Sequence, residues 1–142
     1  MTKQKEALPI ESYVYEPPLA ADASVIWLHG LGADGQDFAA IIDQLGLPDN
    51  HAVRFIFPNA PLRPITVNGG LEMRGWYDIY SLELMERVDT GGIFQSSQII
   101  QQLIEQEILT GIKPARILLA GFRNENAGKY LSLFADTFYC FG

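Results

Sequence analysis

Short apolar runs bounded by turn signals predict the strands of this chain. Three of them lie at 24–28 (SVIWL), 53–57 (VRFIF) and 116–120 (RILLA). Runs of this length with little polar alternation are typical of strands buried on both faces of a parallel sheet. A shorter segment, Ser12–Tyr15, alternates polar and apolar residues and predicts one further strand with a single buried face.

Helical periodicity appears between these strands. It covers 34–45 and 93–109, and a third helix is expected at 124–135. Asp89-Thr90 lies where an N-cap of the second helix is expected, and Gly111 suits the position that follows its last turn. The residues predicted to face the core are Phe38, Ile41, Ile42 and Leu45 in the first helix, and Ile93, Ile100, Leu103, Ile104 and Ile108 in the second.

The order of strands and helices predicts an α/β fold. Alternation of the two gives a mainly parallel sheet with right-handed crossovers and helices on its faces. The proline-rich and glycine-containing stretch 58–76 predicts an ordered surface loop. No linker or repeat interrupts the pattern, so we expect residues 1–142 to form a single domain.

Composition excludes several classes of function. The formal net charge is −7, and the ten Lys and Arg residues are scattered, which argues against nucleic-acid binding. A single cysteine, Cys140, excludes an internal disulfide and fits a reducing compartment. No apolar stretch has the length of a signal peptide core or a membrane span. We therefore expect a cytoplasmic protein without a membrane span.

The stretch after the third buried strand has the pattern of a nucleophile elbow. In that motif, written G-x-S-x-G, a serine sits on a tight turn between a strand and a helix. Here the five positions read Gly121-Phe122-Arg123-Asn124-Glu125. Arginine replaces the serine, and a guanidinium group stays protonated and is no nucleophile.

Four blocks resemble one family of α/β-hydrolases, the carboxylesterases and acyl-protein thioesterases (phospholipase/carboxylesterase family). They are VIWLHGLGADGQDF, FIFPNAPLRPITVNGG, MRGWYDI and GIKPARILLAGF, and together they cover about residues 20–122. The resemblance implies a truncated α/β-hydrolase fold in which strand 25–28 lies between strands 53–57 and 117–121. It also implies hydrolysis of carboxylic esters, lysophospholipids or acyl thioesters of proteins by a Ser-Asp-His triad, with no metal and no organic cofactor.

The resemblance also assigns roles to particular positions. The backbone N–H of Leu31, in the loop His29–Gly32, would be one oxyanion donor, and that of Asn124 the other. Trp76 would line the acyl pocket, with Leu71 and Met73 beside it.

The chain departs from the family at the catalytic positions. Arg123 occupies the nucleophile position, residues 123–142 do not look like the family, and its Asp and His are expected beyond Gly142. We therefore expect a serine hydrolase relative that is inactive. Two alternatives stay open, a non-catalytic acyl-binding module and a degenerate product of a reading-frame shift near codon 123.

No other residue is expected to replace the nucleophile. Ser96 and Ser97 lie inside a predicted helix, Ser132 has no flanking glycines, and Cys140 lies among apolar residues.

The histidines and two of the acidic residues have structural interpretations. His29 is interpreted as a structural hydrogen-bonding residue and His51 as a solvated loop residue. Two distant histidines give no metal signature. Asp78 and Asp89 are expected to cap or to be solvated.

The last expectation concerns self-association. Residues 117–120 would form an apolar sheet edge, which can recruit another chain. The segment Thr137–Phe141 is rich in β-forming residues and is predicted to cover that edge as a substitute strand.

Overall fold

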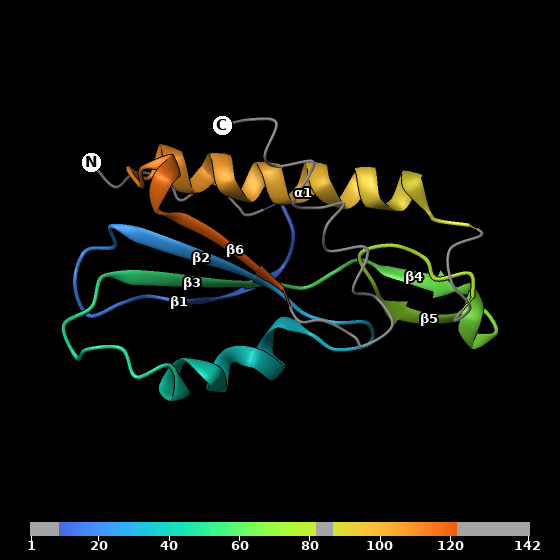
Figure 1. Cartoon of the computed structure of the whole chain (residues 1–142), viewed down its shortest axis with the longest axis horizontal. Coiled ribbons are helices and arrows are strands. Elements are labelled where there is room, and N and C mark those ends of the chain that lie inside the picture. The colour runs from blue at the N-terminus through green and yellow to red at the C-terminus, as the bar shows by residue number, and fades with distance from the viewer. Residues whose placement is uncertain (1–8, 82–86, 122–142) are drawn as a thin grey trace.

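The computed structural model describes residues 9–81 and 87–121, apart from the side chains of residues 37–39. It contains a mixed four-stranded sheet and a separate two-stranded sheet, with a long helix above the larger sheet (Figure 1). The predicted helix 124–135 and strand 137–141 lie outside the described residues. The elements in chain order are β1 (Ser12–Tyr15), β2 (Ala23–Leu28), the 3-10 helix η1 (Gly35–Gln44), β3 (Val53–Pro58), β4 (Leu62–Ile65), the 3-10 turn η2 (Thr66–Asn68), β5 (Leu71–Arg74), α1 (Thr90–Leu109), the 3-10 turn η3 (Pro114–Arg116) and β6 (Ile117–Gly121).

The larger sheet has the strand order β1-β3-β2-β6. Strand β2 pairs in parallel with β3 and with β6, whereas β1 is antiparallel to β3. The predicted sheet order, with β2 between the other two buried strands, is confirmed. The carboxyl ends of three parallel strands therefore meet at one edge of the sheet.

Two hydrophobic clusters cover the two faces of this sheet. Because side chains alternate along β2, Ile26 and Leu28 pack with Ile56, Ile100 and Leu103 on the α1 face. On the other face, Phe55 and Phe57 pack with Ile42 of η1. Burial on both faces thus explains the apolar runs of β2 and β3. For β6 the prediction is wrong at Leu118, which is 60% exposed on the outermost strand of the described sheet.

The first predicted helix differs from the structure in its winding. Residues Gly35–Gln44 form a 3-10 helix. Ile42 is buried as predicted. Leu45 lies beyond the end of the helix and is 42% exposed, so its predicted place in the core is wrong.

Helix α1 begins and ends close to the predicted signals. The Asp89 carboxylate accepts a hydrogen bond from the Gly92 N–H at 2.9 Å, which confirms the N-cap. Gly111 follows the last turn with φ +106°, a conformation that favours glycine. The buried face differs by one position, because Glu107 is buried and Ile108 is 39% exposed.

The predicted surface loop 58–76 contains regular structure instead. Strands β4 and β5 form an antiparallel hairpin from Leu62 opposite Arg74 to Ile65 opposite Leu71. Gly69 and Gly70, with φ +69° and +79°, make the turn. Pro64 is tolerated because a two-stranded ribbon leaves the outer side of each strand unpaired.

Candidate functional site

The loops that follow β2 and β3 meet at the carboxyl edge of the parallel strands, where open α/β sheets bind their ligands. The loop after β2, His29–Gly32, is called the oxyanion loop after the role that the sequence resemblance predicts for it. The Asn59 amide oxygen, just after β3, accepts a hydrogen bond from the Gly35 N–H at 2.6 Å. This bond ties the entry of η1 to the loop after β3. A Cβ at Gly35 would lie 2.2 Å from the Phe57 carbonyl oxygen, so only glycine fits this contact.

His29 anchors the start of the oxyanion loop. Its side chain is 2% exposed, and its Nε2 accepts a hydrogen bond from the Ala60 N–H at 2.9 Å. Its Nδ1 lies 2.7 Å from the Gly30 carbonyl oxygen. The His29 carbonyl accepts a bond from the Trp76 indole N–H at 3.0 Å. The interpretation of His29 as a structural hydrogen-bonding residue is confirmed.

Gly32 holds the other end of the loop. Its φ is +76°, its N–H donates to the Arg74 carbonyl at 2.9 Å, and a Cβ there would lie 2.8 Å from the Met73 methyl carbon. Between the two anchors, the Leu31 N–H donates to no acceptor in the part of the chain that the structure describes. A free donor between two fixed points is what the predicted oxyanion role requires.

The hairpin places two of the three predicted pocket residues beside this loop. Trp76 is 7% exposed and belongs to the hydrophobic cluster on the α1 face. Met73 is partly buried against Gly32. Leu71 is 63% exposed at the end of β5, opposite Ile65. The acyl-pocket role of all three stays a prediction.

Two arginines fix the hairpin at this edge. The Arg74 guanidinium donates to the Ala60 carbonyl at 2.9 Å, and the Arg63 Nε donates to the Gly75 carbonyl at 2.7 Å. The sequence patterns did not indicate these contacts, because both acceptors are backbone atoms.

The alternative nucleophiles are engaged elsewhere or lie outside the described residues. The Ser96 hydroxyl donates to the Trp76 carbonyl, and the Ser97 hydroxyl donates to the Phe94 carbonyl at 2.7 Å. Arg123 and Asn124, like Ser132 and Cys140, fall outside the described part of the chain. Ser96 thus ties α1 to the residue beside the oxyanion loop, a contact that the helical pattern could not reveal.

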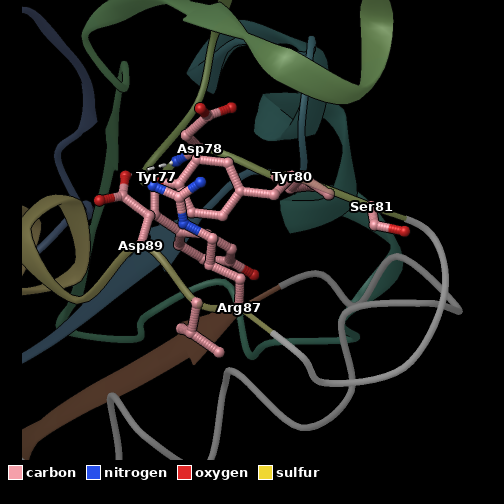
Figure 2. A pocket seen from close by; sticks show the side chains of 8 residues that line it. Tyr77, Asp78, Tyr80, Ser81, Arg87 and Asp89 are labelled. Carbon is pink, nitrogen blue, oxygen red and sulfur yellow. Dashed lines mark hydrogen bonds between the residues drawn. The ribbon is translucent and has the colours of Figure 1, made fainter.

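A small pocket lies farther along the chain, around Tyr77–Ser81 and Arg87–Asp89 (Figure 2). Its volume is about 10 Å³, room for about one water molecule. The Arg87 guanidinium lies over the Tyr80 ring, 4.4 Å from its centroid. The described residues hold no group of three metal-ligating side chains.

The two acids of this region serve as caps, as predicted. The Asp89 carboxylate accepts a bond from the Asp78 N–H at 2.8 Å, in addition to its bond to α1. The Asp78 carboxylate accepts one bond from the Thr66 N–H at 2.8 Å and a second from the Thr66 hydroxyl at 2.5 Å. Burial raises the pKa of Asp78, but the hydrogen bonds from Thr66 outweigh it and hold this pKa below its usual value.

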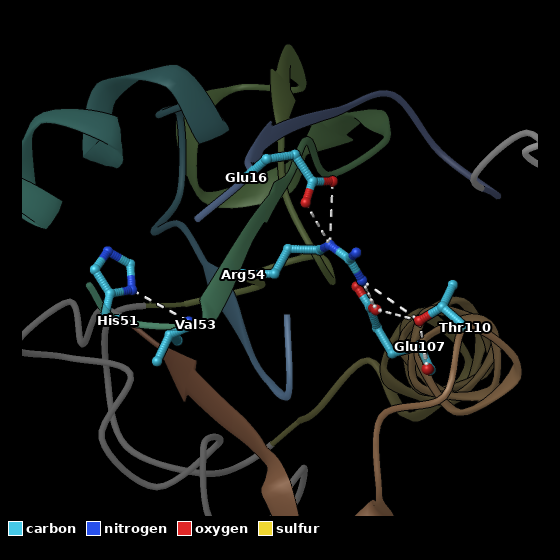
Figure 3. A network of polar contacts seen from close by, with 6 residues as sticks. All are labelled: Glu16, His51, Val53, Arg54, Glu107 and Thr110. Atoms are coloured by element: carbon cyan, nitrogen blue, oxygen red, sulfur yellow. Dashed lines mark hydrogen bonds and ion pairs between the residues drawn. The ribbon is translucent and has the colours of Figure 1, made fainter. Parts of the chain in front are cut away.

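A second polar network joins β3, α1 and the residue that follows β1 (Figure 3). Arg54 of β3 donates to the buried carboxylate of Glu107 at 2.6 Å and to Glu16 at 3.1 Å. Burial lowers the pKa of Arg54, but the two carboxylates raise it above its ordinary value, so the guanidinium stays charged. Thr110 contacts the same Glu107 oxygen at 3.3 Å. This network docks α1 on the sheet.

His51 is less solvated than predicted. Its Nδ1 accepts a bond from the Val53 N–H at 3.1 Å, and its ring stacks on Tyr15 with centroids 5.8 Å apart.

Comparison with known proteins identifies the architecture. A profile of the phospholipase/carboxylesterase family matches residues 11–133, a range that begins before and ends after the four sequence blocks. Acyl-protein thioesterase 1 of Schizosaccharomyces pombe is 40% identical over 130 residues, which cover 92% of this chain and 56% of that protein. The chain thus spans about half the length of the curated relatives that it matches.

Solved structures have the same arrangement of elements. SOBER1 of Arabidopsis thaliana superposes with a TM-score of 0.68 at 27% identity, over 78% of this chain and 53% of that one. Acyl-protein thioesterase 2 of Zea mays gives a TM-score of 0.60 at 30% identity, over 79% and 45%. No helix in the described part is long and apolar enough to cross a membrane. With the α/β-hydrolase fold and most of its length matched, the chain belongs to the phospholipase/carboxylesterase family.

Proposed function

We propose that these 142 residues form the oxyanion side of a carboxylic-ester and acyl-thioester hydrolase. The observation that carries the proposal is the unengaged Leu31 N–H at the carboxyl edge of β2, beside Trp76. In this proposal the Leu31 N–H binds the acyl carbonyl oxygen, and Trp76, Met73 and Leu71 form one wall of the acyl site. Acyl esters, lysophospholipids and acylated proteins are the substrate classes that we propose, since the family is described as phospholipase/carboxylesterase and relatives are named acyl-protein thioesterases.

In a family member with a complete Ser-His-Asp triad, the part of the site that corresponds to this chain would supply the oxyanion donors. A serine at position 123 would attack the acyl carbon, a histidine would take its proton, and an aspartate would orient the histidine. The negative oxygen of the tetrahedral intermediate would lie between the N–H groups of Leu31 and Asn124. Each such donor is worth about 3 kcal/mol of transition-state stabilisation.

We propose further that the 142-residue chain does not hydrolyse these substrates. Arg123 cannot act as a nucleophile, and loss of a triad lowers turnover by about 10⁶-fold. Both histidines of the sequence are committed to backbone contacts, His29 to Ala60 and His51 to Val53. Arg123→Ser alone is therefore expected to leave the chain inactive.

The test is hydrolysis of p-nitrophenyl butyrate and of a palmitoyl thioester by the purified chain. We expect no turnover above that of an Arg123→Ala control and no effect of a serine-directed fluorophosphonate. Turnover above the control that the fluorophosphonate abolishes would show that a nucleophile exists in these residues and would overturn the proposed inactivity.

A non-catalytic acyl-binding module is the second candidate. It is favoured by the combination of a free donor at Leu31 with arginine at the nucleophile position. Titration with palmitate, followed by tryptophan fluorescence, tests it. Saturable binding that Trp76→Phe changes supports the module, whereas absence of binding favours a degenerate gene product without function.

Self-association and location complete the proposal. Strand β6 pairs with β2 on one side, and the described residues provide no strand on its other side. We propose that this edge is covered by 137–141 and that deletion of 136–142 increases association on size-exclusion chromatography. A truncated chain that stays monomeric and melts no lower contradicts it. The single cysteine supports a cytoplasmic location.

A further inference from the structure

Both ring nitrogens of His29 contact backbone groups of opposite character. The Ala60 N–H, 2.9 Å from Nε2, can only donate, so Nε2 must present its lone pair. The Gly30 carbonyl oxygen, 2.7 Å from Nδ1, can only accept, so Nδ1 must carry a proton. The two contacts agree on a single form of the ring, neutral and protonated at Nδ1.

The bond from Nδ1 has a geometric consequence for the next peptide unit. The Gly30 carbonyl and the Leu31 N–H belong to the same planar trans peptide, and they point in opposite directions. Once the carbonyl is held toward the His29 ring, the Leu31 N–H must point away from that ring. The direction of the predicted oxyanion donor is therefore set by the bonds to the Gly30 carbonyl, and the shortest of these comes from His29.

One further bond restrains this peptide unit, because the Ala33 N–H donates to the same Gly30 carbonyl oxygen at 3.3 Å, a longer contact than the 2.7 Å to His29. Gly30 has no side chain, and a Cβ built on it would have no atom within 4 Å. The anchors on either side are fixed, because the His29 carbonyl binds the Trp76 indole and the Gly32 N–H binds the Arg74 carbonyl. Rotation between two fixed ends is how a single peptide unit reverses its direction.

We propose that His29 is a positioning residue that aims the Leu31 N–H through the plane of the Gly30–Leu31 peptide, and that it does so only as the Nδ1-protonated neutral ring. What the N–H then binds, an acyl carbonyl oxygen, rests on the proposed function. The orientation of the peptide does not, so it is measured without any ligand.

The first measurement is the tautomer of each histidine, from long-range proton–nitrogen correlation spectra of the ¹⁵N-labelled, untagged chain at neutral pH. The chain has two histidines, and the second is an internal control. His51 accepts the Val53 N–H at Nδ1, 3.1 Å away, so its proton must be on Nε2, which faces the Tyr15 hydroxyl at 3.3 Å. We expect opposite tautomers in one spectrum. A proton on Nε2 of His29, or a mixture of both forms, would overturn the proposal.

The second measurement separates aiming from folding with two matched variants. His29→Asn places an amide nitrogen near the position of Nδ1 and can still donate to the Gly30 carbonyl. His29→Gln places an amide oxygen near Nε2 and keeps only the bond from Ala60. The readouts are the carbonyl carbon shift of Gly30 and the amide exchange rate of Leu31, with the melting temperature as a measure of stability.

We expect His29→Asn to keep the wild-type Gly30 shift and Leu31 exchange rate. His29→Gln should move the Gly30 carbonyl signal upfield, because the shorter of its two hydrogen bonds is lost while that from Ala33 stays, and should change the Leu31 exchange rate about tenfold. If both variants change these readouts in proportion to their loss of melting temperature, His29 is only structural. If neither variant folds, the tautomers of the unmodified chain decide the question. Failure of palmitate binding leaves both results unaffected and counts only against the proposed function.

Discussion

Replacement of Arg54 by methionine is the sharpest test of how α1 is held on the sheet. The substitution removes the guanidinium but keeps a flexible apolar side chain of similar reach. It leaves Glu107, whose side chain is 5% exposed, without its partner at 2.6 Å. A buried carboxylate that loses its cation is among the most destabilising single changes.

The expected magnitudes follow from the burial of each partner. Arg54→Met should lower the free energy of unfolding by about 3–5 kcal/mol, since it strands a buried charge. Glu16→Gln should lower it by less than about 1 kcal/mol, because the Glu16 side chain is 50% exposed. The double variant Arg54→Met with Glu107→Met should recover most of the loss, because an apolar pair replaces the ion pair.

The assay is guanidinium-induced unfolding followed by far-ultraviolet circular dichroism, with the slope of the transition checked for constancy. Glu16→Gln is the matched control, since it removes the exposed partner of the same arginine. The reasoning fails if Glu16→Gln costs as much as Arg54→Met, or if the double variant loses the sum of its two single losses.

Three further changes test other contacts. Gly35→Ala should lower the free energy of unfolding by at least about 2 kcal/mol, because the added Cβ would lie 2.2 Å from the Phe57 carbonyl oxygen. Gly46→Ala should lower it by about 1 kcal/mol through its φ of +64° alone, and chemical unfolding of both variants compares the two. The pKa of Asp78 is lowered, so its contribution to the free energy of unfolding is present above about pH 4 and is lost as the pH falls through the folded-state pKa. Asp78→Asn should therefore make the free energy of unfolding depend less on pH below about pH 4, as measured by chemical unfolding at several pH values. Leu103→Ala should cost about 2–5 kcal/mol, against less than about 1 for the half-exposed Ile108→Ala, and equal melting temperatures would contradict the assigned helix face.

The strands and α1 could be predicted from the sequence because their signals are local. An apolar run such as 24–28 is buried on both faces, and the cap at Asp89 lies beside the helix that it caps. The hairpin β4–β5 escaped prediction because Pro64 and the pair Gly69-Gly70 are turn signals in isolation. Only the pairing of Leu62 with Arg74 turns them into regular structure.

The site was predictable in part and for a different reason. The position of Leu31 came from a resemblance. That its N–H has no acceptor among the described residues depends on how the loop is held by contacts with residues far away in the sequence. His29 binds Ala60 across 31 positions of the chain. Likewise, Arg54 and Glu107 stand 53 positions apart. Neither the charge pattern nor the hydrophobic periodicity of the sequence predicts which two residues pair at such separations.

The strand order has a consequence for how the chain reaches its native state. Val25 pairs with Phe55 on one side of β2 and with Leu118 on the other, so the second ladder closes a loop about three times longer. The longer closure costs about 1 kcal/mol more in chain entropy. The β2–β3 ladder therefore forms before β6 arrives, as expected for contacts of lower sequence separation. In that interval β2 is an apolar strand with one unpaired backbone edge, and such an edge can pair with another chain during synthesis.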